Sequence, residues 1–418
     1  MSRLLVFLYL VAQLVRPQDW FGPLMGFPTG YVLTLLMFLG GFTVYLRDHQ
    51  FFSIPQNRLI PLYVLVIFIA TWHGTQFSQG LDEATTFAKR ALAFFGIVWL
   101  VNTPERVRFT LSSYLVLAAF LAFQAILQAQ NGVSWGGATL MPGYEEIRVR
   151  WHGDWDGPNV FAILFIISFA IALERVFGPY GATARFFGAV VGALSLVSIF
   201  FTNSRGAVLA VLALTAYYFK DRFSKPVALL LAAGTALAVT AFGPSRMSEV
   251  NTNEASAHER TWLWEQGLQL LRENPVFGIG RAMFSKRVDL GLIAHNNYVQ
   301  NFTELGLPGF FIFISLLWFS LKAGLILARL KSPEHGWAAS YGRTILGIFI
   351  GYAIATFFVV MELDLLYFMM GLCMAIYLSC RRRIPELPVF SMTWTDVKIV
   401  VAGMVALISA VWFVAHKA

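Results

Sequence analysis

The sequence predicts an all-α protein, a bundle of about 12 or 13 helices that span a membrane. Of its 418 residues, 57% are hydrophobic and 13% are charged, and the mean hydropathy is +0.65. These values lie outside the range of soluble globular proteins. Apolar runs recur along the whole chain, whereas alternating strands of about ten residues are absent. Helices are therefore the remaining way to satisfy backbone groups in lipid.

The predicted spans are the apolar runs themselves. They fall at 4–15, 32–46, 59–70, 91–101, 111–127, 160–173, 186–201, 207–219, 226–242, 310–330, 344–361, 365–378 and 397–414. The first run follows a basic residue and is short, as in a signal peptide. However, the Arg16-Pro17-Gln18 sequence lacks the small residues of a cleavage site, so we expect a retained helix.

Basic residues give the chain an orientation. They cluster in short connections at 47–58, 106–108, 175–185, 220–225, 329–343 and 381–383. Short basic loops stay in the cytoplasm, which places the N-terminus inside. The chain then divides into N-terminal helices at 1–242 with an outer loop at 130–158, an outer segment with amphipathic helices at 243–308, and C-terminal helices at 309–418.

The outer segment 243–308 contains two predicted helices. Ser256 and Glu259 have the spacing of a capping box, so a helix begins there and ends before Pro275. Its leucines and its charged residues lie on opposite faces, as in a helix lying along the membrane surface. A glycine-rich turn, "PVFGIG", follows it. The sequence "HNNYVQNFTEL" then begins a second helix, which we expect to break near Gly306.

Three side chains on the outer side are candidates for catalysis. Arg205 stands at the entry to a span, where a guanidinium is costly unless it faces a cavity or snorkels to the headgroups. Arg260 lies in the first turn of the surface helix, where a planar fork of donors suits phosphate oxygens, although interfacial arginines are common beside tryptophans. His295 can accept a proton from a hydroxyl group, or else hydrogen-bond within its helix.

The loop 130–158 mixes charges with aromatic rings. Arg148 and Arg150 are candidates for binding a sugar or a charged headgroup, and a solvated loop is the alternative. Asp154 and Asp156 have D-x-D spacing, which is weak support for a metal, and we predict none. The sequence has no phosphate-binding loop, zinc-protease motif or serine-hydrolase elbow, so ATPase and hydrolase functions lack support. The two cysteines lie near the end of one span and carry no redox signal.

In order along the chain, "SRG" at 204–206, "R-x-W" at 260–262, "ENPVFGIGRAMF" at 273–284 and "HNNYVQNFTELGLPGFFIF" at 295–313 resemble the O-antigen ligase and polymerase superfamily. The resemblance implies a helical, GT-C-like glycosyltransferase that needs no metal or other cofactor. It transfers a glycan from undecaprenyl diphosphate to an acceptor hydroxyl on the periplasmic face of the bacterial inner membrane. The acceptor is lipid A–core, another glycan or a protein, and no nucleic acid is involved.

The resemblance also implies roles for particular residues. Arg205 and Arg260 hold the diphosphate, and His295 acts on the acceptor hydroxyl. Attack from the opposite face of the sugar predicts inversion at C1. The polar residues that follow the histidine are expected to orient it or to bind sugar: Asn296, Asn297, Tyr298 and Glu304.

The individual activity is less specific than the superfamily. We favour a ligase over a polymerase, although the additional run at 397–414 leaves the acceptor open. The rival from another class is an anion transporter, in which charges line a path at the midplane. Glu362 and Asp364 fall instead at the outer end of a span, which favours surface chemistry. A purely structural membrane protein is the third interpretation.

Overall fold

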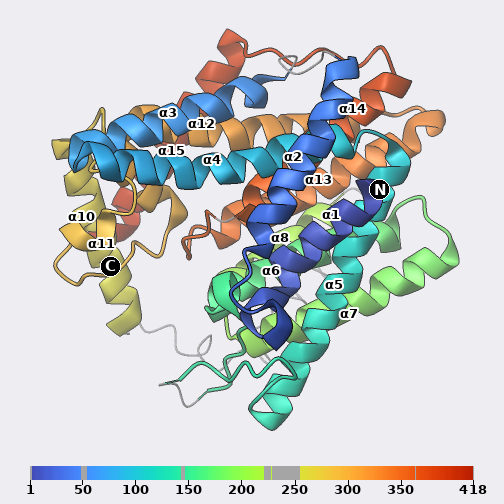
Figure 1. Cartoon of the computed structure of the whole chain (residues 1–418), viewed down its shortest axis with the longest axis horizontal. Coiled ribbons are helices and arrows are strands. Elements are labelled where there is room, and N and C mark those ends of the chain that lie inside the picture. The colour runs from blue at the N-terminus through green and yellow to red at the C-terminus, as the bar shows by residue number, and fades with distance from the viewer. Residues whose placement is uncertain are drawn as a thin grey trace.

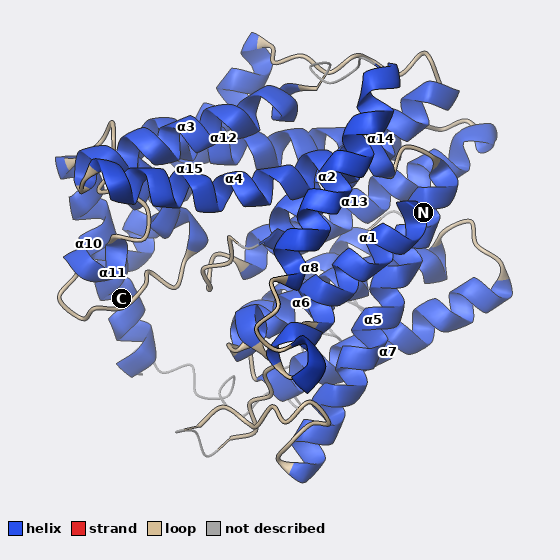
Figure 2. Cartoon of the chain, in the orientation of Figure 1, coloured by secondary structure: helices blue, strands red, loops and turns tan. Residues whose placement is uncertain are grey.

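The computed structural model confirms the all-α fold class. Figure 1 traces the chain, and Figure 2 shows that its regular elements are helices. The structure describes residues 2–48, 54–142, 146–220, 227, 255–362 and 364–417. Within these ranges nine helices are long and apolar enough to cross a membrane, beside two shorter apolar ones. The chain is therefore a multi-pass membrane protein.

The eleven described apolar helices and α4, which carries charged residues, follow one another with mostly short connections. They are α1 (Ser2–Leu10, continued by a π-helical turn, Val11–Val15), α2 (Thr29–Asp48), α3 (Pro55–Gly74), α4 (Phe77–Leu100), α5 (Pro104–Asn131), α6 (Pro158–Phe177), α7 (Ala182–Thr202), α8 (Arg205–Phe219), α12 (Asn297–Ala328), α13 (Gly336–Ala355), α14 (Asp364–Arg383) and α15 (Trp394–Lys417). Two helices, α10 (Ala255–Glu273) and α11 (Phe284–Arg287), precede α12. The predicted span at 226–242 lies outside the described residues, apart from residue 227.

Small residues allow the membrane helices to pack closely. A Cβ atom on Gly371 of α14 would come within 2.3 Å of the Ile97 side chain on α4. Likewise, a Cβ atom on Gly342 of α13 would come within 2.3 Å of the backbone nitrogen of Ala328 on α12. Close backbone approach of this kind is the usual way in which membrane helices gain packing energy.

Helix α4 is longer than the apolar run at 91–101 predicts. It begins at Phe77, and its first half carries charged side chains. Arg90 donates to Asp364 at 2.9 Å, and Glu83 lies 3.8 Å from Arg281. These charges therefore face other helices, and partners inside the protein make them tolerable at this depth. A hydropathy pattern cannot detect such pairing.

Helix α10 has the predicted amphipathic character. Leu263, Gly267 and Leu271 are buried, whereas Glu265 and Gln269 are exposed. The helix contacts α12 and α15, and the C-terminus lies beside it (Figure 1). It begins at Ala255, one residue before the expected cap.

Helix α12 is kinked where the sequence predicts a break, although it continues beyond that point and crosses the expected boundary at 308/309. Gly306 adopts a φ of 65° inside the helix, and Pro308 has no N–H to bond the carbonyl of Glu304. The glycine turn fills the gap: Ile279 N–H donates to Thr303 O at 3.1 Å and Gly280 N–H donates to Glu304 O at 2.9 Å. The two motifs on either side of α11 therefore interlock, and the turn satisfies backbone groups that the kink releases.

Candidate functional site

Four of the predicted site residues meet at one cavity. The cavity has a volume of about 340 Å³, and Arg148, Arg205, Arg260 and His295 line it together. They come from the loop before α6, the first turn of α8, the first turns of α10 and the residue before the N-cap of α12. We call this space the arginine cavity. Among the described residues that line it, Glu259 is the only acid.

Arg205 is the first residue of α8. The Ser204 side chain caps this helix by accepting a hydrogen bond from Ala207 N–H at 3.4 Å. A Cβ atom on Gly206 would lie 2.9 Å from the Phe358 side chain, so only glycine allows this close contact. The "SRG" sequence thus combines a cap, a cation and a residue small enough for Phe358 to approach.

Arg148 is held against the end of α7 by its neighbours. Val149 N–H donates to Phe201 O at 3.0 Å, and Met141 N–H donates to Arg148 O at 2.9 Å. Asn203, which ends α7 in the left-handed conformation with a φ of 53°, donates from its side chain to Glu146 at 2.7 Å. Arg148 is buried, so its charge is directed to the protein and the cavity.

Helix α10 connects Arg260 to the histidine. One turn after Arg260, the indole N–H of Trp264 donates to Ala294 O at 2.8 Å in a buried position. The same indole packs edge-on against Phe357, with ring centroids 5.3 Å apart. The Trp264 side chain therefore joins α10, one turn after Arg260, to the residue before His295.

His295 occupies a strained backbone position. Its φ is 49°, a left-handed conformation that non-glycine residues rarely adopt. Burial and the nearby Arg260 charge lower its pKa to about 4. The sequence predicts a base near its ordinary pKa of about 6.5, so the structure makes it a weaker base than expected, and one that stays neutral at physiological pH.

The polar residues after His295 lie behind the cavity rather than along it. The Asn296 side chain caps α12 by accepting hydrogen bonds from Tyr298 N–H at 2.9 Å and Val299 N–H at 3.1 Å. Asn297 donates to the Tyr352 hydroxyl at 3.2 Å, and the Tyr298 hydroxyl donates to a backbone carbonyl of α13. These residues hold the helix start in place; sugar binding by them remains a prediction.

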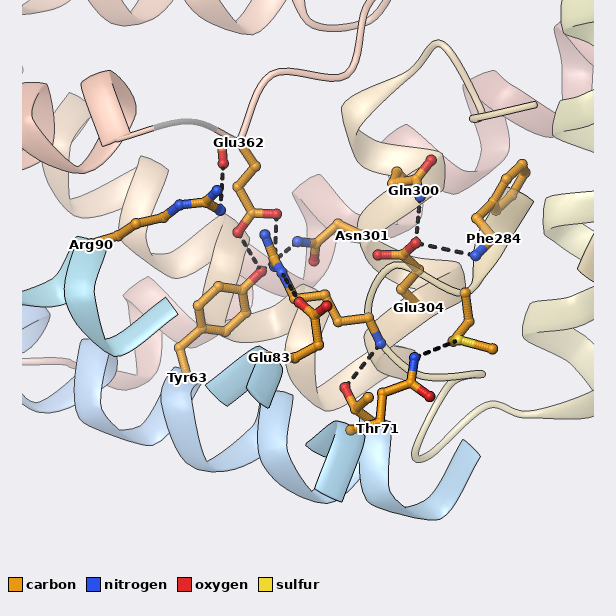
Figure 3. Close-up of polar contacts among 12 residues, drawn as sticks. Tyr63, Thr71, Glu83, Arg90, Phe284, Gln300, Asn301, Glu304 and Glu362 are labelled. Carbon is orange, nitrogen blue, oxygen red and sulfur yellow. Dashed lines mark hydrogen bonds and ion pairs between the residues drawn. The ribbon is translucent and has the colours of Figure 1, made fainter. Parts of the chain in front are cut away.

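Glu304 lies deeper still. It accepts hydrogen bonds from Gln300 and from Phe284 N–H, the latter at 3.2 Å (Figure 3). Gln300 in turn accepts from Ala294 N–H at 3.0 Å, which links Glu304 to the turn that carries His295. Its contacts therefore fit the orienting role among the two that the sequence leaves open.

The second predicted arginine of the outer loop lies apart from the cavity lining. Arg150 donates to Asp156 at 2.7 Å and to Thr139 O at 3.0 Å. Asp154 pairs with Arg16 of the N-terminal segment. The two acids of the D-x-D sequence thus contact different arginines in the described structure and stabilise the loop.

Sequence reasoning missed one wall of the cavity. Phe358, Val359 and Val360, after the end of α13, line it together with the histidine segment. Asn297 N–H donates to Thr356 O at 2.9 Å and thereby joins this wall to the start of α12. The only sequence signal was an apolar run that continues to 361, and it gives no reason to place these residues at a site.

Comparison with known proteins supports the same assignment. A search of curated proteins found no match to this chain. The family model described as O-Antigen ligase matches residues 160–314. This stretch contains Arg205, Arg260 and His295, while Arg148 precedes it. The match confirms the resemblance that the motifs indicate: over these residues the chain is O-antigen ligase-like.

Proposed function

We propose that this protein is a membrane glycosyltransferase that moves a glycan from undecaprenyl diphosphate to an acceptor hydroxyl on the periplasmic face. The main support for this proposal is that three arginines and one neutral histidine line a single cavity. Those residues come from segments up to about 150 positions apart, and only the fold brings them together. The acceptor is lipid A–core, a polysaccharide or a protein in this proposal. We favour a ligase over a polymerase.

The arginines provide positive charge for the leaving group. Three guanidinium groups face one carboxylate, Glu259, among the described lining residues. A diphosphate gains negative charge as its bond to the sugar breaks, and preorganised cations stabilise that charge more than they stabilise the ground state. Arg205 is also the first residue of α8, whose positive end adds to the effect.

His295 accepts the proton in this proposal. The acceptor oxygen attacks C1 of the sugar, the C1–O bond to the diphosphate breaks with its electron pair, and the hydroxyl proton passes to the imidazole. Attack opposite the leaving group inverts the anomeric configuration. The cavity holds the donor, the acceptor and His295 together, so no collision of separate molecules is needed and the barrier is lower.

The low pKa of His295 fits this role when the donor is considered. Burial and Arg260 lower the pKa to about 4 in the ligand-free protein. A bound diphosphate neutralises the charge of Arg260 and adds negative charge nearby, so the histidine becomes a stronger base as the donor binds. The site then has a free imidazole before binding and an adequate base afterwards.

The test is transfer by the purified protein in proteoliposomes, with an undecaprenyl-diphosphate-linked glycan and separate acceptors. We expect the wild type to release undecaprenyl diphosphate and to form an inverted glycosidic bond. Arg205→Ala and Arg260→Ala should each reduce kcat/KM by at least about 100-fold, as for the loss of an oxyanion-stabilising donor.

Arg150→Ala is the matched control, since it removes an outward-paired arginine from the same face. Its rate should stay close to that of the wild type. Equal losses for all three variants would show that general positive charge, and not the arginine cavity, supports the activity. Product on a glycan repeat alone would identify a polymerase.

A further inference from the structure

We propose that Arg281 and Glu362 form a positioning pair that holds two walls of the arginine cavity in register. Neither residue lines the cavity. Arg281 belongs to the "ENPVFGIGRAMF" sequence, to which the proposed chemistry gives no role. The inference rests on the proposed function only for its activity readout.

The Arg281 guanidinium lies between α4 and the segment before α14. Its Nη1 lies 3.1 Å from Glu362 Oε2, and its Nε lies 3.8 Å from Glu83 Oε2. The ring of Phe87 lies 5.5 Å from the guanidinium carbon. The backbone of Arg281 is also fixed, because its N–H donates to the Thr71 hydroxyl at 3.0 Å.

Glu362 is held as completely as its partner. Its Oε1 accepts hydrogen bonds from Tyr63, at 3.2 Å, and from Tyr367. Asn301 of α12 donates to the Tyr63 hydroxyl. The backbone carbonyl of Glu362 accepts from Arg90 at 3.0 Å. Figure 3 shows these groups converging from α3, α4, α12 and the segment before α14.

The pair connects two segments that reach the cavity. Glu362 follows Phe358–Val360, the wall that packs on Gly206, by two residues. Arg281 follows the glycine turn inserted at the kink of α12, in the segment that ends at His295. The side chain of Arg281 is 12% exposed and that of Glu362 is 11% exposed. The salt bridge therefore joins the segment that ends at His295 to the segment that follows Phe358–Val360, outside the cavity lining.

The ion pair contributes more to the placement of the two segments than to the free energy of unfolding. Removing two charges from water costs about as much as their attraction returns, so a buried pair adds little net stability compared with apolar residues of similar size. It does, however, favour one arrangement, because each oxygen and N–H has a partner in a defined direction. A site that depends on the placement of its walls gains from such a constraint.

The first test measures the wall directly and needs no substrate. A cysteine at Val360, a half-buried cavity residue, reports access by its rate of modification with a small methanethiosulfonate reagent; the native Cys373 and Cys380 are buried and are replaced by alanine. We expect Arg281→Lys, which keeps the charge but loses the fork geometry, and Arg281→Gln to raise the rate, the latter by about tenfold.

Arg287→Gln is the matched control, because Arg287 is an exposed arginine on the same segment. It should leave the modification rate unchanged. If Arg281→Lys and Arg281→Gln give the same rate as Arg287→Gln, the positioning role is wrong.

The second test separates geometry from stability. The double variant Arg281→Met/Glu362→Met removes both charges, and we expect it to recover the melting temperature that Arg281→Gln loses. Its Val360 cysteine should still react fast. Its kcat for transfer, like that of Arg281→Gln, should be about 100-fold below the wild-type value, with little change in KM. Recovery of cysteine protection and kcat along with melting temperature would overturn the proposal. A wild type without transferase activity would refute the proposed function alone, since the modification rates remain decisive.

Discussion

At the scale of single residues, the site depends on the charge around one histidine. Burial and Arg260 lower the pKa of His295 to about 4. A histidine with a lowered pKa is neutral above that value and becomes protonated, and so useless as a base, only when the pH falls through it. In the proposed mechanism a bound diphosphate offsets the Arg260 charge, so we expect the pKa of His295 to lie higher in the donor complex.

This difference predicts two distinct pH profiles. The acid limb of kcat/KM reports the free protein, and we expect it near pH 4. The acid limb of kcat reports the donor complex and should lie at a higher pH. Initial rates measured between about pH 3.5 and pH 8 provide both limbs.

Arg260→Lys keeps a cation at the position and is the control for this profile, whereas Arg260→Gln removes it. The glutamine variant should move the acid limb of kcat/KM to a higher pH, because the Arg260 charge no longer lowers the pKa of His295. Coincident limbs in the wild type would contradict the idea that the donor restores the basicity of His295.

At the scale of elements, the glycine turn and the kink of α12 depend on each other. Thr303 and Glu304 carbonyls, released at the kink, accept from the backbone N–H groups of Ile279 and Gly280. Gly306 makes this possible because its φ of 65° and its lack of a side chain let the turn approach; a Cβ there would lie 2.5 Å from Val276 O. The element that carries His295 is thereby seated on a membrane helix.

Gly306→Ala should therefore destabilise the protein by about 1–3 kcal/mol, through strain at positive φ and a clash with the turn. Thermal unfolding in detergent measures the effect. Gly336→Ala is the control, since an added Cβ at Gly336 meets no atom within 4 Å and its φ is helical. Equal melting temperatures for both variants would show that the turn does not need glycine at the kink.

A partly buried ion pair connects the last helix to α12. Lys322 of α12 lies 2.8 Å from Asp396 of α15, and Trp318 donates to the same carboxylate at 2.9 Å. Asp396→Asn leaves the Lys322 charge without its partner and should cost about 3 kcal/mol.

The exposed Lys398 on the same helix offers a control, Lys398→Gln, which should change the free energy of unfolding by about 0.5 kcal/mol or less. Reversible unfolding in mixed micelles compares the two. A similar small change for Asp396→Asn would mean that α15 is held by apolar contacts alone.

The sequence predicts these elements better than it predicts their connections. Apolar runs identify most spans, and motif order identifies three cavity residues. The charged half of α4 and the Phe358–Val360 wall escape, because their burial depends on partners far along the chain. Asn297 and Tyr298 show the converse: polarity next to His295 indicates a site, yet their contacts serve the helix start.

At the scale of the whole molecule, the distribution of basic residues predicts that the arginine cavity lies on the outer side of the membrane. Basic connections alternate with the loops that supply Arg148 and His295. Eleven apolar helices are described, and the crossings number thirteen if α4 and the run at 226–242 also cross as the sequence predicts. An odd number of crossings places the two termini on opposite sides.

We therefore expect the C-terminus, which lies beside α10, on the periplasmic side. Alkaline phosphatase fused after residue 418 should be active, whereas green fluorescent protein at the same place should be dark. A fusion after residue 391, before α15, should show the reverse pattern. A fluorescent fusion at residue 418 would mean an even number of crossings.

We propose that His295 accepts the acceptor's proton in a cavity whose arginines hold the donor. Single-turnover transfer by purified His295→Ala, with donor saturating and acceptor in excess, tests it most directly. We predict that donor binding persists and that the rate of bond formation falls by at least about 100-fold, the lower range for the loss of a general base. Transfer by His295→Ala at the wild-type rate would contradict the account.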